Sequence, residues 1–223
     1  MSHDINNMNQ VAIGFIELAL DHLDLDGSLG DQDRNLLEKP IDALKNSAKL
    51  IDNVKKLQRI RKDSLKSIPM DAGQALDDAV DEFSYKNNRE IRISYTPLKG
   101  CNVMANDLLK DVYSNIIGNC IRHSSPDQPL SICIGAERKR IDGIEYYVVS
   151  IEDNGPGICD ERKESVFDRI DLYKNNKLSS GLGLGLVKAL LEFYRGKVWI
   201  EDRIPGDYRQ GCRFVVAIPS IGH

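Results

Sequence analysis

The hydrophobic positions of the chain follow two different patterns, which divide the sequence into two parts. In residues 1–67 apolar side chains recur every three or four positions, the spacing of an amphipathic helix. A stretch rich in glycine and aspartate at residues 24–31 interrupts this pattern and indicates a turn. The first part is therefore predicted to be two antiparallel helices. Their apolar positions are Ile5, Met8, Ala12, Phe15 and Ala19, and then Leu37, Ile41, Leu44, Ala48 and Ile51.

The second of these helices carries an additional apolar stripe, formed by Leu50, Val54 and Leu57. Two helices alone cannot cover all of these apolar positions, whereas four helices packed as a bundle can. We therefore expect the hairpin to pair with a second copy of itself in a dimeric four-helix bundle.

Residues 68–223 mix helical and strand-like patterns. Helical signals alternate with runs rich in β-branched and aromatic residues, which predicts an α+β fold. We expect an α/β sandwich, in which helices cover one face of a largely antiparallel sheet. The predicted helices are 71–86, 105–123 and 184–195, and the predicted strands are 91–95, 130–134, 146–151, 197–201 and 213–218.

Composition narrows the class of protein. The formal net charge of −4 over 223 residues gives no basic surface for nucleic acid. The longest apolar runs fall well short of the roughly 18 residues that indicate a membrane span. The five cysteines are odd in number and form no Cys-x-x-Cys pair, which is typical of the reducing cytosol. We expect a cytoplasmic chain that contacts neither nucleic acid nor membrane.

The predicted helix 105–123 carries two asparagines, Asn115 and Asn119, four residues apart and so on one helical face. Amide oxygens suit Mg²⁺, which takes its remaining ligands from water and substrate phosphates. Taken alone, such a pair fits a solvated helix face equally well.

Two glycine-rich segments follow. Asp153, at the end of a predicted strand, precedes Gly155 and Gly157; its carboxylate could accept a proton from an exocyclic amine, while the glycines allow a planar ring to approach the backbone. Taken alone, this segment also fits an ordinary turn. The second segment opens a helix whose amides and dipole suit phosphates. It follows a polar loop and not a strand, which disfavours a dinucleotide-binding fold. Its glycines are Gly181, Gly183 and Gly185.

The order of these segments resembles the ATP-binding domain of the histidine-kinase branch of the GHKL ATPases (Bergerat fold), and the resemblance covers nearly the whole chain. It implies that ATP and Mg²⁺ bind here, with Asn115 and Asn119 as the N box and Asn119 as the Mg²⁺ ligand. Asp153 would read the adenine amine, and the two glycine segments would surround the nucleotide. Further positions that the resemblance marks are Arg122 and Lys177 near the phosphates, His123 near the adenine, Val166 and Phe167 in the lid, and Gly211 and Phe214 in the closing strand.

The same resemblance extends to the N-terminal residues. His3, Asp4 and Asn7 resemble a phosphoacceptor H box of the form His-Asp-x-x-Asn. A neutral imidazole offers one nitrogen as nucleophile, and an adjacent carboxylate can take the proton from the other nitrogen. Asn7, one helical turn later, could orient a water for the reverse phosphatase reaction. The resemblance implies phosphotransfer to an aspartate in the receiver domain of a response regulator.

Residues 1–67 are thus predicted to be the dimerisation and phosphotransfer hairpin, and residues 68–223 the catalytic ATP-binding domain. Two departures from the family pattern stand out: no Arg-x-Pro follows the H box, and Cys120 replaces the usual alanine of the N box. Because His3 lies at the start of the chain, we expect a sensory region upstream, with any membrane anchor located there.

Three other functions are compatible with parts of this pattern. A nucleotide-binding dimer that acts as a signalling scaffold would need no phosphoacceptor, and the His3–Asp4 pair counts against it. A serine kinase of the same fold would usually lack the helical hairpin. A redox enzyme with a Rossmann unit would need its glycines directly after a strand.

Overall fold

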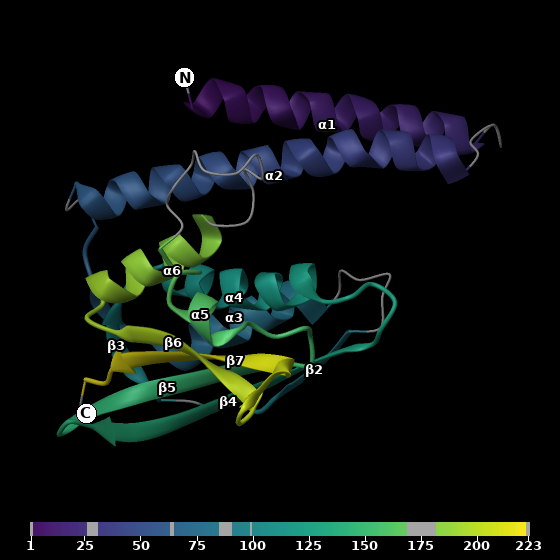
Figure 1. Ribbon diagram of the computed structural model, residues 1–223. Coiled ribbons are helices and arrows are strands. Elements are labelled where there is room, and N and C mark those ends of the chain that lie inside the picture. The colour runs from purple at the N-terminus through teal and green to yellow at the C-terminus, as the bar shows by residue number, and fades with distance from the viewer. Residues whose placement is uncertain are drawn as a thin grey trace.

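The computed structural model describes residues 2–25, 31–62, 65–84, 91–98, 100–168 and 182–221. In the two N-terminal helices, the described side chains are those of residues 9–20, 23, 39–41 and 43–62. Figure 1 shows these two helices stacked on a second unit that contains both helices and strands.

The N-terminal part is a helical hairpin, as the three- and four-residue periods predict. α1 (Ser2–Leu25) and α2 (Asp31–Arg61) run antiparallel, side by side. Ile13 and Ile41 are buried in this hairpin. Asn9 Nδ2 donates a hydrogen bond to Ser47 Oγ at 3.3 Å, and so links the two helices through a polar contact as well. Most of the predicted turn lies outside the described residues.

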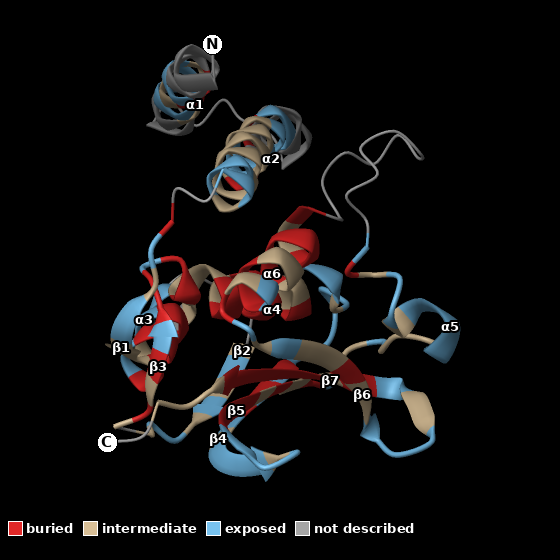
Figure 2. Ribbon diagram, turned by 90° about the vertical axis from the view of Figure 1, so that its left-hand side faces the viewer, coloured by how far each residue is buried: buried red, intermediate tan, exposed pale blue. Residues whose placement is uncertain are grey.

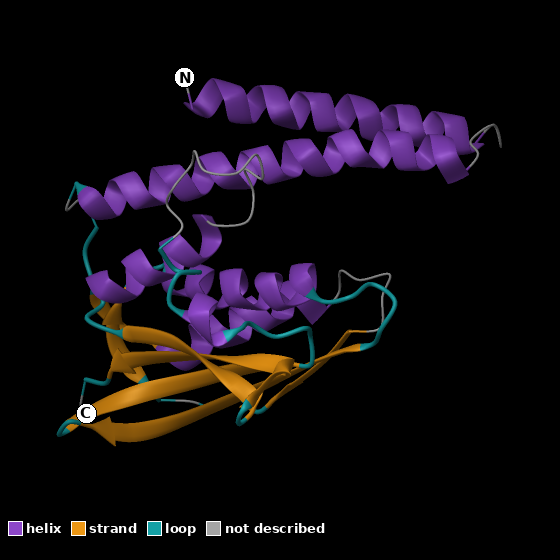
Figure 3. Ribbon diagram, in the orientation of Figure 1, coloured by secondary structure: helices purple, strands orange, loops and turns teal. Residues whose placement is uncertain are grey.

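The second part is a sheet with helices packed on one face, which confirms the predicted α+β class (Figures 2 and 3). Its elements are β1 (Ile68–Asp71), α3 (Ala72–Ser84), β2 (Ile91–Tyr95), β3 (Asn102–Ala105), α4 (Leu109–His123), β4 (Leu130–Ile141), β5 (Ile144–Asp153), α5 (Asp160–Lys163), α6 (Leu182–Phe193), β6 (Lys197–Ile204) and β7 (Asp207–Pro219). Five strands form one sheet in the order β2-β4-β5-β7-β6. Only the β2–β4 pair is parallel, and the other three pairs are antiparallel.

Strand alternation determines which side chains face the helical layer. In β4, Leu130, Ile132 and Ile134 are buried while the residues between them are exposed. These side chains join one core with α3, α4 and α6, in which Leu109 and Ile116 of α4 are fully buried. This shared core holds α3, α4 and α6 against one face of the sheet.

The structure differs from the sequence prediction before α4. Residues 102–105 form β3, which pairs antiparallel with β1 in a separate two-stranded sheet. The helix predicted from residue 105 begins only at Leu109, because Asn106 makes a turn: its Oδ1 accepts a hydrogen bond from the backbone N–H of Leu108 at 3.0 Å. Strands of four residues are too short for their alternation to be recognised in the sequence.

Helix α2 lies between α1 and the helical layer of the second part (Figures 1 and 2). The ammonium of Lys56 pairs with Asp52 in its own helix at 2.7 Å and with Asp111 of α4 at 2.9 Å. This bridge fixes α2 against α4, one helical turn before Asn115. Within the described part of the chain, no helix is both long and apolar enough to cross a membrane.

Candidate functional site

A buried carboxylate marks the centre of the candidate site. Asp153, the last residue of β5, is 5% exposed and is the only charged side chain among the described residues that is buried. Its Oδ1 accepts a hydrogen bond from the backbone N–H of Gly155 at 2.8 Å, and its Oδ2 accepts one from the thiol of Cys212 at 3.0 Å. A carboxylate has roughly four lone-pair positions, so Asp153 retains acceptor capacity for a ligand amine. A carboxylate held inside a protein opposes folding, which makes a functional role the stronger explanation.

Two thiols lie beside this carboxylate. Burial and the negative charge of Asp153 raise the pKa of both Cys120, on α4, and Cys212, on β7. Both thiols therefore stay protonated near neutral pH, and Cys212 acts as a hydrogen-bond donor. The sequence does not reveal the contact of Cys212, because it depends on the register that pairs Glu152 of β5 with Arg213 of β7.

The turn after Asp153 is in close contact with the backbone of β7. Gly157 has φ +67, and a Cβ there would lie 1.5 Å from the carbonyl oxygen of Tyr208. Gly211 has φ +110, and a Cβ there would lie 1.9 Å from the carbonyl oxygen of Asp153. Glycine is required at both positions by sterics as well as by backbone conformation. At Gly157, one of the two glycines for which the sequence predicted the close approach of a ligand ring, the backbone of β7 lies close as well.

Replacing Gly157 by alanine is expected to lower the free energy of unfolding by about 3 kcal/mol or more, since backbone strain and overpacking each contribute about 1–3 kcal/mol. The matched control is Gly206→Ala, because Gly206 has φ +84 but nothing lies within 4 Å of a Cβ there. This control should lose only about 1 kcal/mol, the conformational part of the effect. Urea unfolding followed by circular dichroism measures both, and equal losses would contradict the contact with Tyr208.

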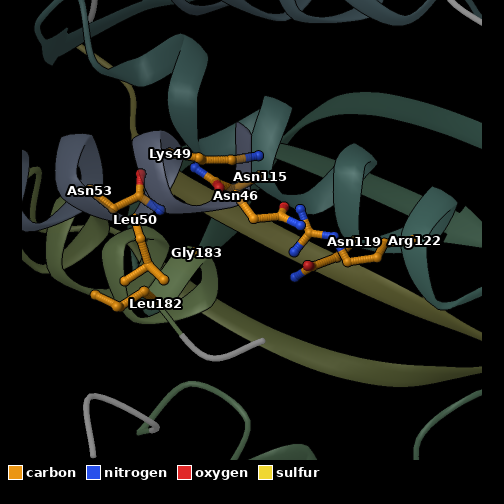
Figure 4. Close-up of a pocket in the computed structure, with 9 residues that line it drawn as sticks. All are labelled: Asn46, Lys49, Leu50, Asn53, Asn115, Asn119, Arg122, Leu182 and Gly183. Atoms are coloured by element: carbon orange, nitrogen blue, oxygen red, sulfur yellow. The ribbon is translucent and has the colours of Figure 1, made fainter. Parts of the chain in front are cut away.

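The two asparagines of α4 have different environments. Asn115 is buried, and its Nδ2 donates a hydrogen bond to the carbonyl of Asp111 at 2.7 Å. Its Oδ1 faces α6, where a Cβ added to Gly183 would lie only 2.9 Å from this oxygen. Asn119 is only half-buried and lines a small cavity together with Arg122 (Figure 4). Asn115 lines the same cavity, but Asn119 is the more accessible of the two amides.

The end of α4 provides a basic and a titratable group. Arg122 and His123 are both exposed. Partial loss of water around the imidazole and the charges of Arg122 and Arg162 lower the pKa of His123, so the ring is neutral near pH 7. His123 lines a second pocket, next to Asn154 and Gly155 of the turn that follows Asp153. It therefore lies on the Asp153 side of the site, while Asn119 and Arg122 line the other cavity.

The glycine-led helix begins next to the N box. Gly183 and Gly185 lie in the first turn of α6, and Gly183 contacts Asn115. The structure thus brings Asp153, Gly155, Gly157, Asn115, Asn119, Arg122, His123, Gly183 and Gly185 to one side of the sheet. Phe167 is buried in the main core, where it anchors the segment after α5.

Five other predicted site residues have no described side chain. Lys177 and Gly181 lie outside the described residues. His3, Asp4 and Asn7 belong to the first two turns of α1, but their side chains are also outside the described part of the chain. Helix α1 itself lies on the far side of α2 from α4 (Figure 2).

Comparison with known families decides the class of the protein. The family described as "Histidine kinase-, DNA gyrase B-, and HSP90-like ATPase" matches residues 104–221. The chain belongs to this family. The match includes α4, the Asp153 turn, α6 and β7, so the residues gathered at the site are those of an ATP-binding domain.

The chain is also similar to parts of longer curated proteins. Cyanobacterial phytochrome A of Nostoc sp. is 27% identical over 99% of this chain and 28% of the relative. The adaptive-response sensory kinase SasA of Synechocystis sp. is 30% identical over 62% of this chain and 34% of the relative. The chain spans about a quarter to a third of the length of these relatives. It is homologous to the catalytic cores of sensor histidine kinases.

Solved structures share the fold of this family member. Full-length ShkA in complex with AMPPNP is 20% identical, with a TM-score of 0.63 over 100% of this chain and 45% of that chain. The catalytic domain of the histidine kinase ThkA is 23% identical, with a TM-score of 0.57 over 70% of this chain and 96% of that chain. At this level of identity the likeness concerns the fold alone.

Proposed function

We propose that this chain is the core of an ATP-dependent histidine autokinase of a two-component system, with His3 as its phosphoacceptor. The observation that carries the proposal is the buried carboxylate of Asp153, which keeps free acceptor positions beside an N-box helix. In the same chain, a helical hairpin carries a histidine followed by an aspartate.

The residues at the site suit ATP and Mg²⁺. Asp153 would accept a hydrogen bond from the exocyclic amine of adenine, and neutral His123 would lie near the base. Asn119 offers an amide oxygen of the kind that Mg²⁺ prefers. Bound Mg²⁺ would offset the negative charge of the phosphates. The first turn of α6, with Arg122 and Lys177, would hold the phosphates.

The transfer step is an in-line displacement. One imidazole nitrogen of His3 attacks the γ-phosphorus, a P–N bond forms, and the P–O bond to ADP breaks. Asp4 accepts the proton that leaves the other imidazole nitrogen as positive charge develops there. The phosphoryl group then passes to an aspartate of a receiver domain. Asn7 would orient a water against the phosphorylated regulator, which gives the core a phosphatase activity as well.

The hairpin is proposed to dimerise. Val11, Phe15 and Leu18 recur at helical spacing on α1 and are 58%, 69% and 64% exposed. An exposed apolar stripe of this kind is typical of an interaction surface. A second copy of the hairpin would cover it in a four-helix bundle. Because α2 lies between α1 and α4, His3 can receive the phosphoryl group only if the ATP-binding part moves or reaches the α1 of the second copy.

The defining experiment incubates the full chain with γ-labelled ATP and Mg²⁺. We expect a protein-bound label that is stable in base and lost in acid, the behaviour of phosphohistidine, and its transfer to an added receiver domain. ATP binding without any label would instead favour the signalling scaffold. An acid-stable label would favour a serine kinase of the same fold.

A further inference from the structure

Helix α2 closes one side of the nucleotide site. A cavity of about 20 Å³ lies between α2, α4 and the start of α6 (Figure 4). Its α4 wall contains Asn119 and Arg122, and its α2 wall contains Asn46, Lys49 and Asn53. The family's site is therefore extended here by residues of the hairpin, more than 50 positions earlier in the chain.

The charges around this cavity favour an anion. Its lining contains two cationic side chains, Lys49 and Arg122, together with amides, and no described carboxylate. Burial and the nearby charge of Arg122 lower the pKa of Lys49, and the carboxylates of Glu82 and Asp111, outside the cavity lining, oppose this shift without cancelling it. Lys49 is exposed as a whole residue, but its Nζ reaches α4, where it lies 4.0 Å from the position of a Cβ on Gly118. Two like charges facing one space are stabilised when an anion lies between them.

The size and position of the cavity restrict which anion fits. A volume of this size holds about one water-sized group, so one phosphoryl oxygen can enter it but a whole nucleotide cannot. Cys120 faces Asp153, whereas Asn119 and Arg122 face the cavity. A nucleotide whose base lies at Asp153 would thus point its phosphates toward this space, and only the last phosphoryl group would reach α2.

We propose that Lys49 of α2 contacts the terminal phosphoryl group of bound ATP, so that the hairpin contributes to the selection of ATP over ADP. Asn46 and Asn53 are placed to support this contact with amide hydrogen bonds. The inference rests on the proposed function, because it requires that ATP binds with its base at Asp153. The Lys56–Asp111 ion pair, two turns along α2, holds this wall in place.

The test compares ATP and ADP binding to the full wild-type chain and to Lys49→Gln, by isothermal titration calorimetry with Mg²⁺. We expect the dissociation constant for ATP to rise about tenfold, the effect of one lost charge-assisted hydrogen bond. The constant for ADP should change less than threefold. Lys49→Arg should keep ATP affinity within threefold of wild type, because the positive charge is retained.

The matched control is Lys45→Gln, one helical turn earlier, because the ammonium of Lys45 pairs with Glu17 of α1 at 3.0 Å and faces away from the cavity. It should bind both nucleotides as wild type does. Unchanged or tighter ATP binding in Lys49→Gln would overturn the inference, and so would equal losses for ATP and ADP. If the wild-type chain bound no ATP, the proposed function itself would fail, and the two failures are thus distinguished.

Discussion

Replacement of His3 by glutamine is expected to abolish the acid-labile label and to leave ATP affinity within about twofold of wild type. The amide of glutamine has no nucleophilic nitrogen lone pair at neutral pH, so no P–N bond can form. His3 is also on a different helix from every residue of the nucleotide site. The amount of protein-bound label should fall at least a hundredfold, which is about the smallest residual signal that a labelling experiment detects.

A matched control is available in the same helix. His22 also belongs to α1, but the residues around it do not form a His-Asp-x-x-Asn pattern. His22→Gln should therefore label as wild type does. Full labelling of His3→Gln, or loss of label in His22→Gln alone, would contradict the assignment of His3 as the phosphoacceptor.

Replacement of Asp153 by asparagine is expected to weaken ATP binding by about 30-fold or more. A hydrogen bond to a charged group contributes about 1.5–3 kcal/mol, and each 1.4 kcal/mol is a factor of ten. The neutral amide would also turn one N–H toward either the backbone N–H of Gly155 or the thiol of Cys212, both of which are donors. Equilibrium dialysis with ATP measures the change, and thermal unfolding verifies that the variant is folded.

The neighbouring residue of β5 provides the control for this prediction. Glu152 pairs with Arg213 of β7 at 2.8 Å on the opposite side of the strand. Glu152→Gln removes a carboxylate of the same strand but does not touch the candidate site, so ATP affinity should be unchanged. If Asp153→Asn bound ATP as tightly as wild type does, the adenine would have to be recognised elsewhere.

The sequence predicted those features that depend on local pattern. The periods of three and four residues in the first 61 residues match α1 and α2. The β-rich runs at 130–134 and 146–151 lie inside β4 and β5, and both strands extend beyond the predicted ranges. The order of the asparagine pair, the Asp153 turn and the glycine-led helix was enough to suggest the family that the comparison confirmed.

Features that depend on contacts between distant residues were not predicted. The thiol of Cys212 meets Asp153 across a separation of 59 residues, and the sequence does not reveal the register that aligns them. The packing of α2 on α4 is another case, because Lys56 and Asp111 are 55 residues apart. The burial of Asn115 was not predicted either, because it depends on the packing of α6 against this side chain.

The bridge that holds α2 against α4 has a consequence for ionic strength. Lys56, Asp52 and Asp111 keep 19%, 50% and 27% of their side chains exposed, so dissolved ions can screen the attraction among them. The sheet and its helical layer are held instead by an apolar core that salt does not weaken. Leu57 and Ile60 of α2 also pack against this core, so rising salt should weaken the ionic contact between α2 and α4 while the apolar contact remains.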